Sequence, residues 1–456
     1  MSGRLALVLH THMPYVEGFG TWPFGEEWLW EAVATSYLPL LDVLDAKPGK
    51  VTLSLTPVLC DQLEAPAVGD RLLAFLRDVR PESHRLDVEA AGDAAVTREL
   101  ERSAALYVDA AERFEARGGD LVAAFAPHVS WTSAATHAVL PLLATAEGIR
   151  LQIHTGIASH RTRFGGWSGG FWLPECAHAP WLDEPLEEAG VHAVCVDLTD
   201  VFGPGAAEQL RPLRSAAGPL LVPIDRATLE LVWHPDGYPS HPAYRDSHRL
   251  TEHRHMAWAN DGSPYDPQRA SAQARADAAD FAARARERLA AGGLCVCAFD
   301  TELLGHFWHE GPLWLAAVIE ACESEGVALV ALDDALADPQ EQPPPAPPGL
   351  PVTSWGQPRD LTTWSGPRAG GLAWQQRAAE LRVFGGGEVV RPRALRELLA
   401  LQSSDWAFGI THETAGDYPR ERAVGHAVAL DAALTESAEI DGRLRNLAPW
   451  LDLSNP

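Results

Sequence analysis

Short apolar segments recur along this chain and alternate with segments of helical periodicity. The apolar segments are rich in β-branched and aromatic residues and too short for helices, so they predict strands. They are Leu5–Leu9, Val51–Leu55, Val129–Thr132, Phe171–Leu173, Val191–Val196, Leu220–Ile224, Leu294–Phe299 and Val327–Leu332. Helical patterns cover Glu26–Leu44, where Pro39 predicts a kink, and also Thr136–Ala146, Pro267–Ala291 and Pro312–Ser324. Alternating strands and helices predict an α/β fold with a parallel sheet, and about seven strands favour a closed barrel.

Two stretches interrupt this alternation. Residues 65–119 contain a long helical pattern at Ala94–Arg117 and predict an inserted helical subdomain. Residues 338–351 read DPQEQPPPAPPGLP, which is typical of a stiff proline-rich linker. Helical patterns follow the linker at Gln375–Val383, Pro392–Gln402 and Pro419–Leu444. We therefore expect a barrel over 1–337, a linker over 338–351 and a helical C-terminal domain over 352–456.

The charge of the chain restricts its partners. There are 36 Lys and Arg against 62 Asp and Glu, which gives a net charge of −26. Such a surface repels phosphate backbones and anionic lipids, so we expect no nucleic-acid or membrane partner, whereas neutral sugars are not repelled. The start of the chain, MSGRLALVLHTHMPY, lacks the apolar core of a signal peptide. We expect a cytoplasmic protein whose six cysteines are buried free thiols.

Titratable side chains follow several of the predicted strands. His10 and His12 come at the end of the first strand, Glu175 follows Phe171–Leu173, and Asp300 follows Leu294–Phe299. In a parallel α/β barrel the functional residues lie at the C-terminal ends of the strands, so these side chains should converge. A pair of carboxyl groups is the equipment for breaking a glycosidic bond. The pattern therefore predicts an active site for sugar chemistry.

Each of these residues also has another interpretation. His-x-His after a strand is a metal-ligand pattern in hydrolase barrels, Glu175 could be a salt-bridge partner, and Asp300 could cap the following helix. A metal-dependent hydrolase would need further ligands, and the sequence offers none with suitable spacing. A non-catalytic glucan-binding protein would explain the 16 tryptophans but not carboxyl groups at two strand ends. We expect neither a metal nor another cofactor.

Motifs along nearly the whole chain resemble those of one enzyme family. They are LHTHMPY at 9–15 with WPFGEEWLWEA at 22–32, AATHAVLPLL at 134–143, GFWLPECA at 170–177, CAFDTELLGHFWHEGP at 297–312, SWGQPRDLTTW at 354–364 and LLALQSSDWAF at 398–408. These motifs resemble glycoside hydrolase family 57, and within it the short α-1,4-glucan branching enzymes. The resemblance implies a (β/α)7 barrel, an inserted helical subdomain, and a helical C-terminal domain that contributes to a glucan cleft.

The resemblance also implies roles for individual residues in a retaining mechanism without metal. Glu175 would be the nucleophile and Asp300 the general acid/base. His10, His12 and His137, with His160 as a weaker candidate, would line the subsite of the reacting glucose. Asp405 would hydrogen-bond a hydroxyl, and four tryptophans would stack on glucose units, with core packing as the alternative for each: Trp28, Trp355, Trp364 and Trp406. Tyr238, in the loop 232–248, would cap the cleft, and the alternative for it is an exposed turn residue.

The activity implied by this resemblance is that of a 1,4-α-glucan branching enzyme acting on amylose or a glycogen-like polymer. It would break an α-1,4 bond, hold the chain on Glu175 and pass it to a 6-hydroxyl. An α-amylase or a 4-α-glucanotransferase on the same site remains an alternative, because both would use the same covalent intermediate. The segment Thr251–Trp258 is shorter than its counterpart in the family. A shortened cover would admit water, so hydrolysis would compete with branching.

Overall fold

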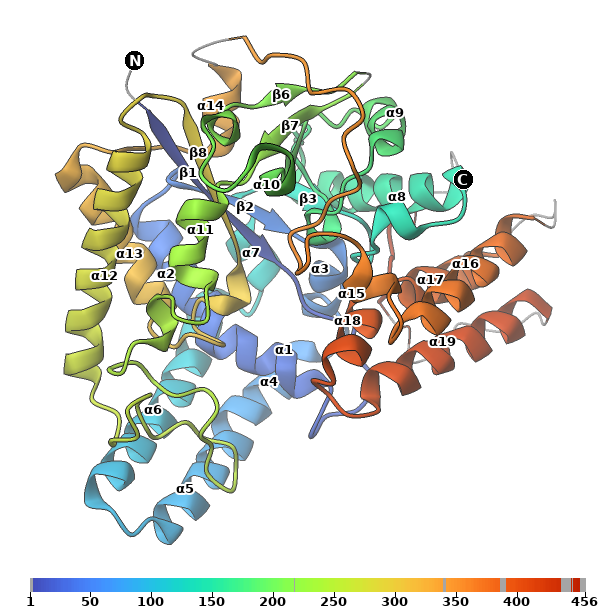
Figure 1. Cartoon of the computed structure of the whole chain (residues 1–456). Helices are drawn as coiled ribbons and strands as arrows, with labels where there is room; N and C mark the ends of the chain where they lie inside the picture. Colours follow the sequence, from blue (N-terminus) through green and yellow to red (C-terminus); the bar gives the residue numbers. More distant parts are fainter. Residues whose placement is uncertain are drawn as a thin grey trace.

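The strands of the barrel lie where the apolar segments predict them. The computed structural model describes residues 3–216, 218–338, 342–385, 391–435, 444 and 446–451. The barrel strands are β1 (Arg4–Thr11), β2 (Val51–Leu55), β3 (Val129–Ser133), β4 (Phe171–Trp172), β5 (Ala193–Val196), β7 (Leu220–Pro223) and β8 (Leu294–Asp300). One parallel sheet runs in the order β4-β3-β2-β1-β8, and β5 pairs with β7 in parallel (Figure 1).

Two backbone contacts join these sheets into a ring. A parallel bridge between Gly170 and Ala193 connects the β4 side to β5. The N–H of Asp225, just after β7, donates to the carbonyl of Val296 in β8 at 2.7 Å. The predicted (β/α)7 barrel is thereby confirmed. β6 (Leu213–Arg214) adds an antiparallel pair to β7.

The last apolar segment is not a full barrel strand as predicted. Only β9 (Ala328–Leu329) is extended in Val327–Leu332, and it pairs with the beginning of β1. Residue Leu332 already begins helix α14, and its N–H donates to the hydroxyl of Thr52 at 2.7 Å. The seven strands close the barrel without this segment, so the segment has no free strand edge along which to pair.

The helices that surround the barrel follow their strands. They are α1 (Glu26–Ala32), the π-helical turn η1 (Val33–Tyr37), α2 (Leu38–Ala46), α8 (Ala146–Phe164), α9 (Asp183–Glu188), α10 (Thr199–Phe202), α11 (Arg226–Trp233), α12 (Pro267–Arg288), α13 (Gly311–Glu325) and α14 (Leu332–Ala337). Short 3-10 turns are η3 (Leu140–Leu142), η4 (Pro174–Cys176), η5 (Pro180–Leu182), η6 (Ala207–Leu210), η7 (Tyr238–Ser240) and η8 (Thr301–Leu303). The π turn ends two residues before Pro39, which lacks the N–H for a helical hydrogen bond, so the α-helical pattern is interrupted next to the proline.

The helix predicted at Thr136–Ala146 is wrong. His137 has a φ of 58°, which no helix tolerates, and the chain then forms the short turn η3. The helix begins only at Ala146, where the hydroxyl of Thr145 accepts the N–H of Gly148. Helix α8 is buried on much of its circumference, so its sequence lacks the single apolar stripe by which a surface helix is recognised.

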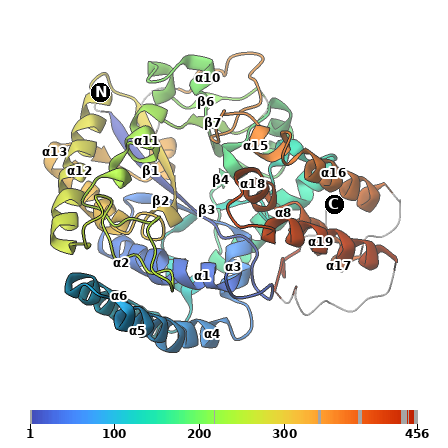
Figure 2. The same cartoon turned by 60° about the horizontal axis from the view of Figure 1, so that its bottom comes forward.

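The insertion between β2 and β3 is helical. It comprises α3 (Pro57–Leu63), α4 (Val68–Ala74), the π turn η2 (Phe75–Val79), α5 (Arg80–Ala90), α6 (Ala94–Ala116) and α7 (Leu121–Phe125). Helices α5 and α6 pack against each other, and Figure 2 shows them along α1 and α2. This layer supports the helices that follow β1.

The region after the barrel is helical and packs on the C-terminal ends of the strands. Its helices are α15 (Thr362–Ser365), α16 (Gly370–Phe384), α17 (Pro392–Leu401), α18 (Ser404–His412) and α19 (Tyr418–Thr435). Bridges from Ala138 to Ser403 and from His178 to Thr353 tie it to the loops after β3 and β4. Residues 339–341 of the expected linker and 436–443 of the last expected helix lie outside the described residues.

Two further expectations can be compared with the structure. All six cysteines are buried and free, as predicted. In the described part of the chain, none of the helices has the length and apolar character needed to cross a bilayer.

Gly305 lets the loop after β8 dock on the π turn. Its φ is +108°, and a Cβ there would lie 1.9 Å from the carbonyl oxygen of Thr35. Gly305→Ala is therefore expected to lower the free energy of unfolding by about 2 kcal/mol or more. Gly371→Ala is the matched control, because a Cβ there meets nothing within 4 Å on helix α16. Urea unfolding of both variants measures the difference, and equal stabilities would contradict the docking role.

Candidate active site

Glu175 stands directly after β4 in a strained conformation. Its φ and ψ are 62° and 22°, a left-handed conformation that costs free energy for a residue with a side chain. Trp355 holds it twice: its backbone N–H donates to the Glu175 carbonyl at 3.0 Å and its indole N–H to Oε2 at 3.1 Å. The other oxygen, Oε1, lies 3.7 Å from Nδ1 of His137. The carboxyl group is thereby fixed between His137 on one side, the histidine side, and Trp355 on the other, the tryptophan side.

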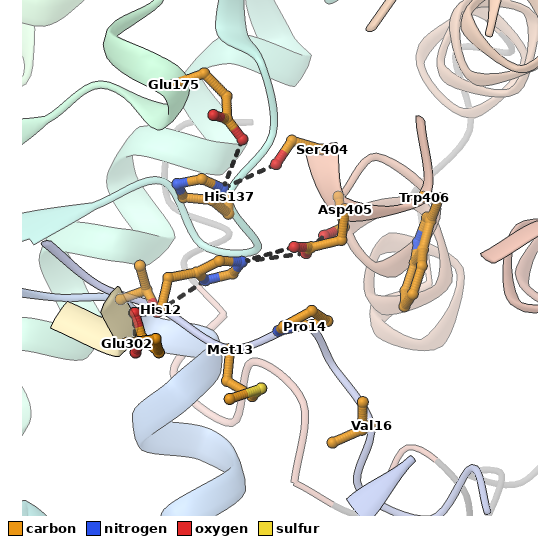
Figure 3. A network of polar contacts seen from close by, with 12 residues as sticks. His12, Met13, Pro14, Val16, His137, Glu175, Glu302, Ser404, Asp405 and Trp406 are labelled. Carbon is orange, nitrogen blue, oxygen red and sulfur yellow. Dashed lines mark hydrogen bonds and ion pairs between the residues drawn. The ribbon is translucent and has the colours of Figure 1, made fainter. Parts of the chain in front are cut away.

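The histidines form a stacked layer beside Glu175. The rings of His12 and His137 lie 4.0 Å apart, and His10 stacks on Trp172 at 4.7 Å. Nε2 of His10 and Nε2 of His137 share a hydrogen bond of 2.9 Å. Nε2 of His12 lies 3.1 Å from both carboxylate oxygens of Asp405, which reaches over from α18 (Figure 3). The structure thus brings together residues from β1, β3 and the C-terminal region.

These histidines differ in charge. Burial, together with the charge of His12, lowers the pKa of His10 and of His137 well below the usual value, so both rings are neutral. Burial also opposes the charging of His12, but the hydrogen-bonded carboxylate of Asp405, with Glu302 and Glu175, outweighs it and raises the pKa of His12. His12 is therefore the imidazole in this layer that most readily carries a positive charge.

Asp300 is the last residue of β8 and lies opposite His10 in the register of β1 and β8. Its side chain makes no hydrogen bond to the following turn, so it does not act as a helix cap. Burial and the neighbouring carboxylates of Glu302, Glu175 and Asp405 raise the pKa of Asp300 well above the usual value. These surroundings favour the protonated form of the Asp300 carboxyl group.

Glu175, unlike Asp300, has neighbours that favour its ionised form. Burial raises the pKa of Glu175 to about 7, while the hydrogen bond from Trp355 opposes this rise. A hydrogen bond from Ser404 and the charge of His12 act in the same direction as Trp355. Two carboxyl groups in different environments, one with hydrogen-bond donors and one without, are what a nucleophile and an acid require at one site.

The sequence reasoning missed the role of Glu302, which is buried beside His12. Its Oε1 accepts the hydroxyl of Tyr37 at 2.6 Å and the backbone N–H of His12 at 3.1 Å. Burial raises the pKa of Glu302 to about 7. The sequence Asp300-Thr301-Glu302 at the strand end could have indicated this role, since a carboxyl group two residues beyond Asp300 can reach the same site.

Ser404 is a second residue that the sequence reasoning missed. Its hydroxyl lies 2.8 Å from Nδ1 of His137, and it also hydrogen-bonds Glu175. Ser404 begins helix α18, next to Asp405. A serine at the start of a helix usually only caps it, so the sequence alone did not mark Ser404 as a site residue. Its position next to Asp405 was the only indication.

The tryptophans expected to stack on glucose fall into two groups. Trp28 and Trp355 are half-buried. Trp364 and Trp406 are each only 1% exposed, and the indole N–H of Trp406 donates to the carbonyl of Ala400 at 2.7 Å. This burial contradicts direct stacking of a sugar on Trp364 or Trp406 and supports the alternative of core packing, since both rings fill the space between α15, α18 and their neighbours.

Tyr238 does not cap the cleft in this structure. Its hydroxyl donates to Oδ2 of Asp280 in α12 at 2.7 Å, and its ring lies 6.4 Å from that of Trp314 in α13. The expectation that Tyr238 caps the cleft is therefore wrong, because its hydroxyl is bound to a carboxylate of α12. His160, the weaker candidate, is buried in α8 against Phe164.

Trp233, at the end of α11, lies near Trp355, the residue that holds Glu175. It is 38% exposed, and its ring lies 6.3 Å from the ring of Trp355. At the other end of α11, Arg226 donates to the carbonyl of Trp355 at 2.8 Å. Helix α11 is thus anchored at both ends on the residue that holds Glu175.

The ring nitrogens of the histidine layer have protein partners. His10 also contacts the hydroxyl of Ser54 at 3.3 Å, and Nδ1 of His12 contacts Thr56 at 3.2 Å. Over the described residues, no group of three or more His, Cys, Asp or Glu side chains is arranged to hold a metal ion.

Comparison with known proteins places this site in a family. Residues 131–345 match glycosyl hydrolase family 57, and residues 383–448 match the C-terminal region of 1,4-alpha-glucan branching enzymes. A probable 1,4-alpha-glucan branching enzyme of Mycobacterium tuberculosis is 32% identical over 94% of this chain and 91% of its own length. The chain belongs to glycosyl hydrolase family 57.

Other relatives extend this comparison. A 1,4-alpha-glucan branching enzyme of Thermococcus kodakarensis is 30% identical, over 94% of this chain and 72% of its own. The crystal structure of a branching enzyme of this family from Pyrococcus horikoshii superimposes with a TM-score of 0.87 at 29% identity, covering 100% of this chain and 98% of that one.

The pKa of Glu302 makes a prediction for stability. The pKa rises from an ordinary 4.5 to about 7 on folding, so the folded state binds the extra proton between these values and loses stability as the pH rises through them. Glu302→Gln removes this loss. It should be more stable than the wild type by about 2–3 kcal/mol above pH 7, and the advantage should shrink toward pH 4.5. Unfolding in urea across this pH range measures it, and the exposed Glu184→Gln is the control. A pH-independent difference would show that the carboxylate of Glu302 is not destabilised by burial.

Proposed function

We propose that this protein is a 1,4-α-glucan branching enzyme that breaks an α-1,4 bond and transfers the chain to a 6-hydroxyl of a glucan such as amylose or a glycogen-like polymer. The observation that carries the proposal is the pair Glu175 and Asp300, which stand at the ends of β4 and β8. Burial raises the pKa of both carboxyl groups, and the hydrogen bond from Trp355 opposes the rise at Glu175. The 32% identity to a probable branching enzyme over 94% of the chain supports it.

The proposed reaction uses two displacements. Glu175 attacks C1 of the glucose, and Asp300 gives its proton to the departing oxygen, so that one C1–O bond forms as the other breaks. Asp300 is then ionised and takes the proton from the 6-hydroxyl of the acceptor. That oxygen attacks C1 and releases Glu175 as a carboxylate. The hydrogen bond from Trp355 and the charge of His12 favour this carboxylate.

The two sides of Glu175 suggest where the two chains lie. Oε1 faces His137, and the layer formed by His10, His12 and His137, together with Asp405, would hold the glucose that is attacked. Oε2 faces Trp355, with Trp233 beyond it. We assign the departing and accepting chains to this tryptophan side. Trp28 would contact the glucan farther along.

The division of labour within the chain follows from this proposal. Glu175 and Asp300 belong to the barrel expected over 1–337, whereas Trp355 and Asp405 come from the region expected over 352–456. The C-terminal region would therefore complete the glucan cleft. The intermediate is transferred to a sugar rather than to water only if the cleft orients the sugar, because orientation supplies an effective molarity far above that of bulk water.

The catalytic pair is tested by substitution. Glu175→Gln and Asp300→Asn should each reduce turnover of amylose by about 10³-fold or more, since each loses an essential chemical role. New reducing ends, and chain lengths after debranching, measure turnover with and without a chelator. The thermal midpoint of each variant should stay near that of the wild type or rise. Substantial activity of Glu175→Gln would refute its role as nucleophile, and loss of activity on chelation, restored by zinc, would refute the metal-free mechanism.

The tryptophan side is tested by the acceptor. Trp233→Ala should lower the ratio of new α-1,6 branches to new reducing ends by about threefold or more, because a lost stacking surface no longer orients the acceptor. Trp233→Phe should retain most of the ratio. Tyr238→Phe is the control, since it removes only the hydroxyl bound to Asp280. A fall in Tyr238→Phe, or an unchanged ratio in Trp233→Ala, would return the acceptor role to Tyr238.

A further inference from the structure

A cavity of about 600 Å³ lies at the N-terminal ends of the barrel strands, away from the candidate active site. The first residues of β1, β7 and β8 line it, together with β6. Arg4 precedes His10 by six residues on the same strand, so about 20 Å separates the two ends. The cavity is therefore distinct from the site of glycosidic chemistry. Its lining includes Arg4, Leu210, Arg211, Arg214, Leu294 and Pro344.

Three arginines line this cavity in a chain whose net charge is −26. The described lining residues include no Asp or Glu. Arg4 donates to the carbonyl of Ala335 at 3.2 Å, and Arg214 donates to the carbonyl of Pro343 at 3.1 Å. Neither guanidinium forms an ion pair with a residue that the structure describes. Two positive charges of the cavity therefore lack a counter-charge within the described part of the chain.

The walls of the cavity are held by backbone hydrogen bonds. The N–H of Arg4 donates to the carbonyl of Gly293 at 2.9 Å, and the N–H of Arg214 donates to the carbonyl of Pro344 at 2.8 Å. The N–H of Ala346 donates back to the carbonyl of Arg214 at 2.8 Å, so the proline-rich segment is fixed on β6. Figure 1 shows β6, α14 and the beginning of β1 at the same end of the molecule. Walls that are already formed spare a ligand the cost of ordering the chain.

The lining combines guanidinium groups with apolar surface. Guanidinium groups bind phosphate oxygens through paired N–H donors, and they also stack on nucleobases. Leu210 and Leu294 are each 5% exposed, and Pro343 and Pro344 add apolar ring faces. A cavity of this volume is in the range that holds a drug-sized molecule, so an inorganic phosphate would leave most of it empty. The lining fits a ligand that carries both phosphate groups and a flat apolar group.

We propose that this cavity binds a nucleoside diphosphate. Arg4 and Arg214 bind the two phosphate groups, with the exposed Arg211 at the rim, and the base lies against the leucines and prolines. The inference does not depend on the proposed function, because none of the residues assigned to the catalytic site lines the cavity. A ligand that binds only the folded chain also raises its stability.

Calorimetric titration of the whole chain tests the proposal. ADP or UDP should bind with a Kd below about 1 mM. Adenosine and uridine, which lack phosphate, and glucose 6-phosphate, which lacks a base, should bind about tenfold more weakly or worse. Maltotriose should not displace the nucleotide, because it would occupy the catalytic cleft.

Substitution of one arginine locates the site. Arg214→Gln should raise the Kd about tenfold, because it removes charge-assisted hydrogen bonds, and Arg214→Lys should retain part of the affinity. Arg275→Gln is the matched control. Arg275 is exposed on α12, outside the cavity, and like Arg214 it donates to a main-chain carbonyl, that of Ser271 at 3.4 Å.

The outcomes separate this inference from the proposed function. A Kd above about 1 mM for both diphosphates overturns the inference. An equal loss of affinity in Arg275→Gln overturns it as well, since it would mark a general attraction of anions to the surface. Equal affinity for glucose 6-phosphate, or displacement by maltotriose, would also overturn it. Nucleotide binding by a chain that neither binds nor converts amylose would refute the proposed function alone.

Discussion

The burial of several carboxyl groups around one imidazole governs the architecture of this site. Glu175, Asp300, Glu302 and Asp405 approach one another at the C-terminal ends of the barrel strands, where they cannot all be ionised without a large desolvation cost. The protein resolves this by holding protons on some of them and a positive charge on His12. The proton affinities therefore belong to the group as a whole, and a change at one member alters the others.

This charge arrangement requires contributions from both ends of the chain. The barrel supplies His12, Glu175 and Asp300, but the raised pKa of His12 depends on Asp405 from α18. The carboxylate of Glu175 depends on the indole of Trp355, which lies beyond the expected linker. A barrel without the helical region would expose these groups to water and weaken the pKa shifts that burial and these neighbours cause. Under the proposed function, the helical region is thus part of the catalytic machinery as well as of the glucan cleft.

The sequence predicted most of what depends on local pattern. Strands buried on both faces have continuous apolar sequences, so the bounds of β2 were predicted to the residue. The rule that functional residues follow the strand ends predicted that Glu175 and Asp300 lie in one site. Contacts between distant side chains were not predictable. The sequence around a tryptophan does not show whether its ring is exposed or buried, and Trp406 is buried. The sequence of the loop that contains Tyr238 also gave no sign that its hydroxyl would bind Asp280.

Some of the backbone strain in this chain lies in the same site as the buried carboxyl groups. Glu175 and His137 both have a positive φ although neither is a glycine, a conformation that costs about 1 kcal/mol or more at each position. In each case the strained residue is held by hydrogen bonds from the helical region: Trp355 binds both the carbonyl and the carboxylate of Glu175, and Ser404 binds the ring of His137. The strained backbone turns the side chain of Glu175 toward the histidine layer, whereas a relaxed backbone would direct it elsewhere. The helical region therefore stabilises both the strained backbone and the buried charges. The barrel alone would not maintain this arrangement.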